Sequence, residues 1–300
     1  MAPSALIVPL MIRAAVSMAA VLALGIGRAG QEPIAQFSSG VQLVEVYATV
    51  TDDKGELVTG LRQSDFEVYE NDKPQEISAF AAGEFPLTVA LGVDRSFSMA
   101  GEPLRLAKQA SQAFLRQLKP SDMSMVVAIG NDADVIAPLS NDHEAQGRAI
   151  AALDAWSTTS LHDAVIAALD RLEPEKGRQA LVIFSDGVDR YSHAKSSEVI
   201  ARARRSQALI YPITIGRARP TTPAELAVLT GGRSFVLRDA KELDRTLAAI
   251  ARELRYQYLI GYAPAAPARS GAHEWRAIRV TVKNAQAGVR VRARDGYRTE

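Results

Sequence analysis

Side chains with hydroxyl or carboxylate oxygens occur at three places in the sequence, each next to an expected strand or helix. Asp94, Ser96 and Ser98 follow an apolar run at positions i, i+2 and i+4, so their side chains can point the same way from one loop. Thr159 precedes an expected helix, and Asp186 follows a second apolar run. Two carboxylates and three hydroxyls, without nitrogen or sulfur, are donors suited to hard cations such as Mg²⁺ or Mn²⁺. The five residues predict a divalent-cation site.

The mixture of carboxylates and hydroxyls also indicates what such an ion would do. Two carboxylates neutralise a divalent ion only if both bind it directly. If one acts through water, the ion stays electrophilic and favours an external carboxylate as a further ligand. Two alternatives stay open: Thr158 competes with Thr159 for the ligand role, and Asp94 or Ser98 would also suit the cap of the helix that follows.

The residues that must position this site form alternating apolar strands and amphipathic helices. Strands are expected at 87–93, 125–129, 134–139, 180–184, 209–215 and 234–237. Their continuous apolar character is typical of strands covered on both faces. The alternation predicts an α/β fold, a doubly wound Rossmann-like sheet over residues 86–250. Ligands of such sheets bind beyond the carboxyl ends of the strands, where Asp94 and Asp186 are expected.

Both flanks of this region read as β-strands and carry opposite charge. Residues 31–85 hold 3 basic and 11 acidic side chains, whereas residues 251–300 hold 10 basic and 4 acidic ones. Neither flank is long enough for a stable sheet domain of its own. We therefore expect one β-sandwich in two parts, 31–85 and 251–300, with the α/β domain inserted between them. The alternative is that each flank packs separately onto the α/β core.

The first thirty residues resemble a leader rather than part of the fold. An uncharged apolar run at 14–27 follows Arg13 and is shorter than the roughly 20 residues of a spanning helix. Small residues stand at Ala29 and Gly30. This pattern predicts a signal peptide over 1–30 and an exported protein, whether periplasmic, envelope-associated or secreted. An uncleaved membrane anchor is the alternative.

Composition excludes several classes of function. The chain has 300 residues, a formal net charge of +1 and no cysteine. It therefore lacks the basic character of nucleic-acid binders, and disulfides, thiol catalysis and thiolate metal sites are excluded. No GxSxG, P-loop or GxGxxG motif stands at a strand-to-helix turn, so we do not expect an enzyme.

The combination of Asp-x-Ser-x-Ser, a central threonine and a late Ser-Asp-Gly resembles the metal-ion-dependent adhesion site of von Willebrand factor type A (VWA) domains, over about residues 85–250. The resemblance implies Mg²⁺ (or Mn²⁺) as the cofactor, with the hydroxyls of Ser96, Ser98 and Thr159 as direct ligands beside Asp94 and Asp186. The flanks resemble a bacterial subgroup of these proteins through three motifs: Val50-Thr51-Asp52 with Gly55, Asp65-Phe66-Glu67-Val68-Tyr69-Glu70, and Gly261-Tyr262-Ala263-Pro264.

Two positions depart from the family pattern. Phe97 and Thr158 stand where the family often has glycine, and both bulky side chains can alter which partner reaches the metal. The resemblance implies an exported adhesion or binding protein that captures an Asp or Glu of a protein partner through the cation. The alternatives are a metal-dependent hydrolase that uses the same ion as a Lewis acid, and a metal-free structural interaction module.

Overall fold

The computed structural model of the chain describes residues 43–217, 220–239, 242–265, 273–283 and 288–299. The expected signal peptide at 1–30 lies outside these residues. None of the helices in the described ranges has both the length and the apolar character needed to cross a membrane.

A six-stranded sheet forms the centre of the α/β part, in the order β10-β9-β8-β5-β6-β7. Its strands are β5 (Leu87–Asp94), β6 (Met123–Ile129), β7 (Ala133–Ser140), β8 (Arg178–Ser185), β9 (Leu209–Ile215) and β10 (Phe235–Leu237). All neighbours pair in parallel except β6 and β7, which are antiparallel. β5 and β8 therefore end at the same edge of the sheet.

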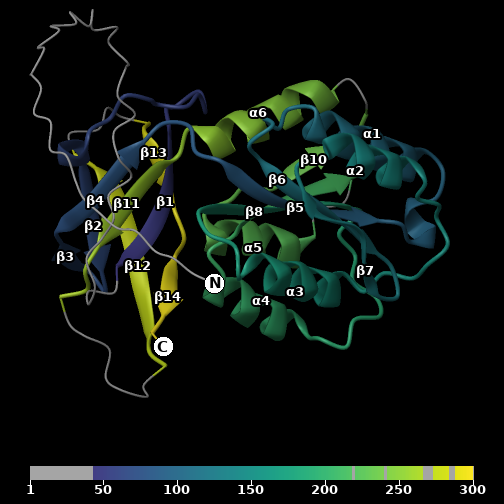
Figure 1. The fold of residues 1–300 in the computed structure, drawn as a ribbon. Helices are drawn as coiled ribbons and strands as arrows, with labels where there is room; N and C mark the ends of the chain where they lie inside the picture. The colour runs from purple at the N-terminus through teal and green to yellow at the C-terminus, as the bar shows by residue number, and fades with distance from the viewer. Residues whose placement is uncertain (1–42, 218–219, 240–241, 266–272, 284–287, 300) are drawn as a thin grey trace, which may run out of the picture. The chain divides into compact units, whose positions relative to one another are not determined.

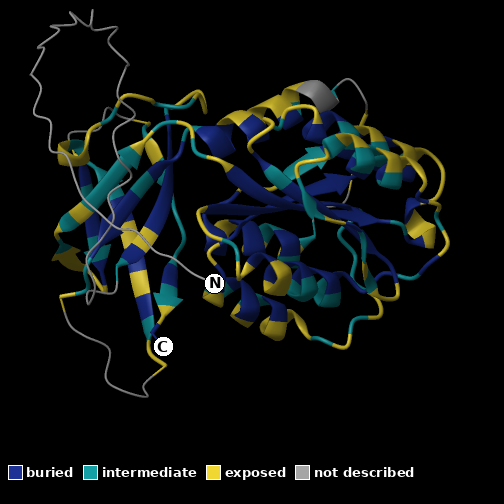
Figure 2. Ribbon diagram, in the orientation of Figure 1, coloured by how far each residue is buried: buried dark blue, intermediate teal, exposed yellow. Residues whose placement is uncertain are grey.

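Helices cover both faces of this sheet (Figure 1). They are α1 (Glu102–Leu115), α2 (His143–Ala151), α3 (Leu161–Leu172), α4 (Ser196–Arg205), α5 (Thr221–Thr230) and α6 (Leu243–Arg255). Neighbouring residues of β5 face opposite layers: Val89 and Leu91 pack with α1 and α6, whereas Ala90 packs with α3. Figure 2 shows the sheet as an almost continuous buried layer. The doubly wound α/β fold expected from the apolar runs is confirmed.

Two further four-stranded sheets, ordered β13-β1-β11-β4 and β14-β12-β2-β3, combine strands from both flanks. The strands are β1 (Val44–Thr51), β2 (Phe66–Glu70), β3 (Lys73–Gln75), β4 (Ile77–Ala82), β11 (Tyr258–Tyr262), β12 (Trp275–Val282), β13 (Arg290–Arg292) and β14 (Gly296–Arg298). Pairing joins β1 to β11 and β2 to β12, so the insertion of the α/β domain into a β-sandwich is confirmed. The exact domain boundaries stay a prediction, and the one at 250/251 falls within α6.

Residues of both flanks meet in the sandwich core around one carboxylate. Glu70 of β2 is 5% exposed and lies 2.9 Å from the Arg276 guanidinium of β12. The Tyr262 and Tyr297 hydroxyls donate to its other oxygen at 2.9 and 2.8 Å. Burial, and then the Glu70 carboxylate, raise the pKa of Tyr262. Because Glu70 comes from the first flank and its partners from the last, this cluster joins the two ends of the chain.

Candidate functional site

Asp94 is the last residue of β5, and its side chain is fully buried. One carboxylate oxygen accepts the Ser96 amide at 2.9 Å, and the other accepts the Ser185 hydroxyl at 2.5 Å. Burial raises the pKa of Asp94, these hydrogen bonds lower it, and the nearby Asp186 raises it again. The parallel ends of β5 and β8 therefore hold a carboxylate whose charge is poorly stabilised by the protein alone.

Ser96 and Ser98 lie in the loop that follows β5. Their hydroxyl oxygens are 3.1 Å apart, so both face the same side of the loop. Ser96 is buried, whereas Ser98 is exposed, and the short 3₁₀ turn η2 (Phe97–Met99) carries Ser98 outward. The i, i+2 spacing thus brings two hydroxyls together beside Asp94, as the sequence predicts.

The loop at 156–160 is tied to the Asp94 loop by main-chain contacts. Ser96 and Ser157 form a parallel β-bridge, and the Phe97 amide donates to the Ser157 carbonyl at 2.8 Å. Thr159 lies two residues after Ser157 in this loop and is 1% exposed. Its carbonyl accepts the amides of Arg190 and Tyr191, both at 3.1 Å, which connects it to the segment after Asp186.

Asn131 fixes this loop from the turn between β6 and β7. Its side-chain oxygen accepts the Ser157 hydroxyl at 3.0 Å and the Thr158 amide at 3.1 Å, and it also accepts the Thr158 hydroxyl. Since the Thr158 hydroxyl is engaged there, Thr159 is the better candidate for a ligand. Sequence reasoning missed Asn131; the turn signal Gly130-Asn131-Asp132 after an apolar strand marks its position.

Asp186 follows β8 and is half-buried. One of its carboxylate oxygens accepts the Val188 amide at 3.0 Å. The sharp turn depends on Gly187, which has a φ of +81° and lies so close to Pro220 that a Cβ would overlap the ring. Ser185, which the sequence placed in the motif but not in the site, orients Asp94.

The structure thus brings together Asp94, Ser96 and Ser98 and places Thr159 and Asp186 on adjoining loops. Within the described residues, no hydrogen bond links the side chain of Thr159 or Asp186 to those of the other three. Neither Asp94 nor Asp186 has a Lys or Arg within ion-pair distance in that part of the chain. Two carboxylates without a cationic partner, next to several hydroxyls, fit a divalent cation in charge and donor chemistry.

No three His, Cys, Asp or Glu side chains gather to hold a metal in the described part of the chain. Any cation at this edge therefore depends on the hydroxyls. Both oxygens of Asp94 already accept hydrogen bonds from the protein. This suits a carboxylate that acts on the cation through water.

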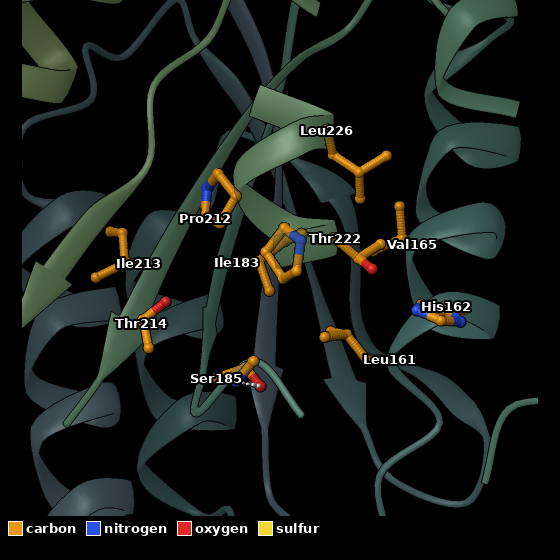
Figure 3. A pocket seen from close by; sticks show the side chains of 12 residues that line it. Leu161, His162, Val165, Ile183, Ser185, Pro212, Ile213, Thr214, Thr222 and Leu226 are labelled. Carbon is orange, nitrogen blue, oxygen red and sulfur yellow. Dashed lines mark hydrogen bonds between the residues drawn. The ribbon is translucent and has the colours of Figure 1, made fainter. Parts of the chain in front are cut away.

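A small apolar pocket lies behind the same loops, between β8, β9, α3 and α5 (Figure 3). Leu161, Val165, Ile183 and Leu226 supply its walls, and the Gly187 amide donates to the Ser185 hydroxyl at its rim. His162 borders it, with its Nδ1 3.1 Å from the Ala194 carbonyl. The His162 contact connects the start of α3 to the segment that follows β8, and the Gly187 contact holds the turn after β8.

Comparisons with known proteins agree with this fold. Residues 89–188 match the family model described as von Willebrand factor type A domain. A solved von Willebrand factor type A structure from Catenulispora acidiphila has a TM-score of 0.53 and 16% identity, covering 85% of this chain and 73% of that chain. Proximal thread matrix protein 1 from the mussel byssus has a TM-score of 0.50 and 14% identity, covering 62% of this chain and 51% of that one. No curated protein matches the sequence. At these identities the structural likeness concerns the fold.

Proposed function

The chain is a von Willebrand factor type A domain protein, and from that premise we propose that it binds a protein partner through a divalent cation held at the carboxyl edge of its central sheet. Domains of this family serve mostly as interaction modules rather than enzymes. The partner supplies an Asp or Glu carboxylate, and the cation is Mg²⁺ or Mn²⁺. The protein is exported, and the loop edge faces the partner outside the cytoplasm.

One observation carries this proposal: the buried Asp94 carboxylate lies beside the paired hydroxyls of Ser96 and Ser98 and near Asp186, and no Lys or Arg of the described residues lies within ion-pair distance of either carboxylate. The hydroxyls of Ser96, Ser98 and Thr159 would hold the ion directly, and the two carboxylates would offset its charge. When bound, the ion supplies an electrophilic position that a further carboxylate can occupy.

The other residues of this edge keep the donors in place. Ser185 orients Asp94 by donating to it, and Asn131 holds the loop that carries Thr159. Such outer contacts matter because they fix the orientation of a ligand before the ion arrives. Export is supported by the apolar run after Arg13 and the small residues at Ala29 and Gly30, and N-terminal sequencing of the mature protein tests it.

Thermal unfolding and calorimetry with Mg²⁺ and Mn²⁺ test the cation site on wild type and Asp94→Asn. We expect either ion to raise the Tm of the wild type. A ligand at a concentration one hundred times its Kd raises the free energy of unfolding by about 2.7 kcal/mol. Asp94→Asn should lose this response. Without metal it should be no less stable than wild type, because the amide removes a buried charge and keeps both hydrogen-bond positions occupied.

Asp134→Asn is the matched control, because Asp134 is an exposed carboxylate on the edge strand β7. It should keep the full metal response. The cation site would be refuted if neither ion changed the Tm of the wild type, or if Asp94→Asn showed as large a rise in Tm as the wild type. Partner binding that persists in EDTA would favour the metal-free interaction module instead.

A further inference from the structure

Three aromatic side chains stand out on the surface of the described residues. Phe97, Trp156 and Tyr191 are 65%, 59% and 61% exposed. The described residues expose only one other large apolar side chain to a similar degree, Val228 on α5. An exposed aromatic ring is costly in water, and exposed apolar side chains on neighbouring loops mark sites of interaction. We refer to Phe97, Trp156 and Tyr191 as the aromatic rim.

Each member of the aromatic rim is attached by its main chain to the loops of the candidate cation site. Phe97 stands between Ser96 and Ser98, and its amide donates to the Ser157 carbonyl at 2.8 Å. The amide of Trp156 donates to the Arg95 carbonyl at 3.1 Å, and that of Tyr191 to the Thr159 carbonyl at 3.1 Å. The three rings therefore come from three separate segments that meet at the Asp94 edge of the sheet.

Arg95 places a positive charge against one ring of the aromatic rim. Its guanidinium carbon lies 4.9 Å from the centre of the Trp156 ring, a cation–π distance. Its Nε is buried and has no hydrogen-bond partner among the residues that the structure describes. Trp and Arg are among the side chains that contribute most to the free energy of protein–protein binding. The charge of Arg95 also favours an acidic partner.

We propose that the partner presents its Asp or Glu on a segment whose neighbouring residues are large and apolar, and that these residues pack against the aromatic rim. The inference rests on the proposed function and adds the specificity that cation capture lacks, since any exposed carboxylate could satisfy a metal ion. Phe97 stands where the family often has glycine. Its ring lies on the loop of the proposed ion and would select partners by apolar contact. A lipid surface would cover the same apolar rings without supplying an Asp or Glu carboxylate, and the test below separates it from a peptide segment.

The test is selection of a displayed library of short random peptides on the full chain in Mg²⁺. We expect recovered peptides to contain an Asp or Glu with Phe, Leu, Ile or Trp within two positions. Phe97→Ser, Trp156→Ser and Tyr191→Ser should each weaken binding of these peptides about tenfold. All three should keep the Mg²⁺-induced rise in Tm. Val228→Ser, which removes an equally exposed apolar side chain from α5, is the control and should bind like wild type.

The outcomes separate the two proposals. Acidic peptides without apolar neighbours, or rim variants that bind them normally, would overturn the inference and leave cation capture intact. Peptides that lack acidic residues, or bind equally in EDTA, would overturn both. Binding of the wild type to phosphatidylcholine vesicles that the rim substitutions abolish would assign the rim to a lipid surface and likewise overturn the inference.

Discussion

A single amide side chain controls the loop that carries Thr159. Asn131 accepts hydrogen bonds from Ser157 and twice from Thr158, although it lies on a different turn of the chain. Without these bonds the main-chain contacts of the loop would remain, but the hydroxyls of Ser157 and Thr158 would lose the acceptor that links them to the turn after β6. Asn131 is therefore a positioning residue.

We expect Asn131→Ala to weaken Mg²⁺ binding roughly tenfold to a hundredfold, the usual effect of removing a contact that orients a metal ligand. Calorimetric titration measures the affinity. Because Asn131 is exposed, the free energy of unfolding without metal should change little. Asn141→Ala, at another exposed asparagine, is the control. An affinity equal to wild type would show that the loop needs no such support.

For single residues, the sequence predicts side-chain types and the loops that carry them, but not their hydrogen-bond partners. The spacing of Asp94, Ser96 and Ser98 predicts that they share a side of one loop, and the Ser96–Ser98 contact agrees. The role of Asn131 depends on how two loops far apart in sequence approach each other. Exposure of Trp156 likewise depends on packing, so the sequence leaves burial and exposure equally open. Whether the five predicted residues hold a metal stays a prediction.

The end of α6 depends on one buried arginine of β8. Arg178 is 1% exposed and donates to the carbonyls of Leu254, Arg255 and Gln257, the last two at 3.0 and 3.1 Å. The last carbonyls of a helix have no partner within the helix. Burial lowers the pKa of Arg178 to about 10, a sign of how little water reaches it. Arg178 thereby fixes the place where the chain leaves α6 for β11.

Arg178→Met should destabilise the protein by about 3 kcal/mol or more, because three buried carbonyls lose their donor. Urea unfolding followed by circular dichroism measures this loss. Arg171→Met, at an exposed arginine of α3 that bonds the Ala167 carbonyl within its own helix, should cost well under 1 kcal/mol. Equal midpoints for the two variants would contradict the assignment.

Apolar periodicity predicts most strands and helices, because burial of a strand on both faces leaves a continuous apolar run and burial of one helix face leaves a regular spacing. The direction of β7 shows what such a pattern omits. Only Gly130, Asn131 and Asp132 connect β6 to β7, too few residues for a parallel crossover, so the pair is antiparallel. The length of the connecting loop indicates whether two neighbouring strands are parallel or antiparallel, whereas the apolar runs do not.

The acidic first flank and the basic last flank form specific ion pairs with each other. Glu70 meets Arg276, Asp72 lies 3.3 Å from Arg279, and Glu56 lies 3.6 Å from Arg252. The charge difference between the flanks predicted that they associate. Strand order and register depend on turns and side-chain packing, so no count of charges could supply them.

Glu70→Gln should lower the free energy of unfolding by about 3 kcal/mol, since it removes the negative charge that forms a buried ion pair with Arg276. Chemical unfolding measures the change. Glu76→Gln, at an exposed position beside β4, should be close to neutral. If Glu70→Gln were as stable as Glu76→Gln, the cluster would not hold the two flanks together.

The insertion has a consequence for synthesis on the ribosome. The neighbours of β1 are β11 and β13, and β2 lies between β3 and β12, so the first flank cannot complete either sheet until the last strands have been made. Val44 finds its partner only at Tyr262. Until then the strand exposes apolar residues and unpaired amides, a condition that promotes aggregation. Residues 31–85 hold 11 acidic and 3 basic side chains, so copies of this unpaired segment repel one another. Residues 251–300, which are basic, neutralise that charge once they have been synthesised and the sheets form.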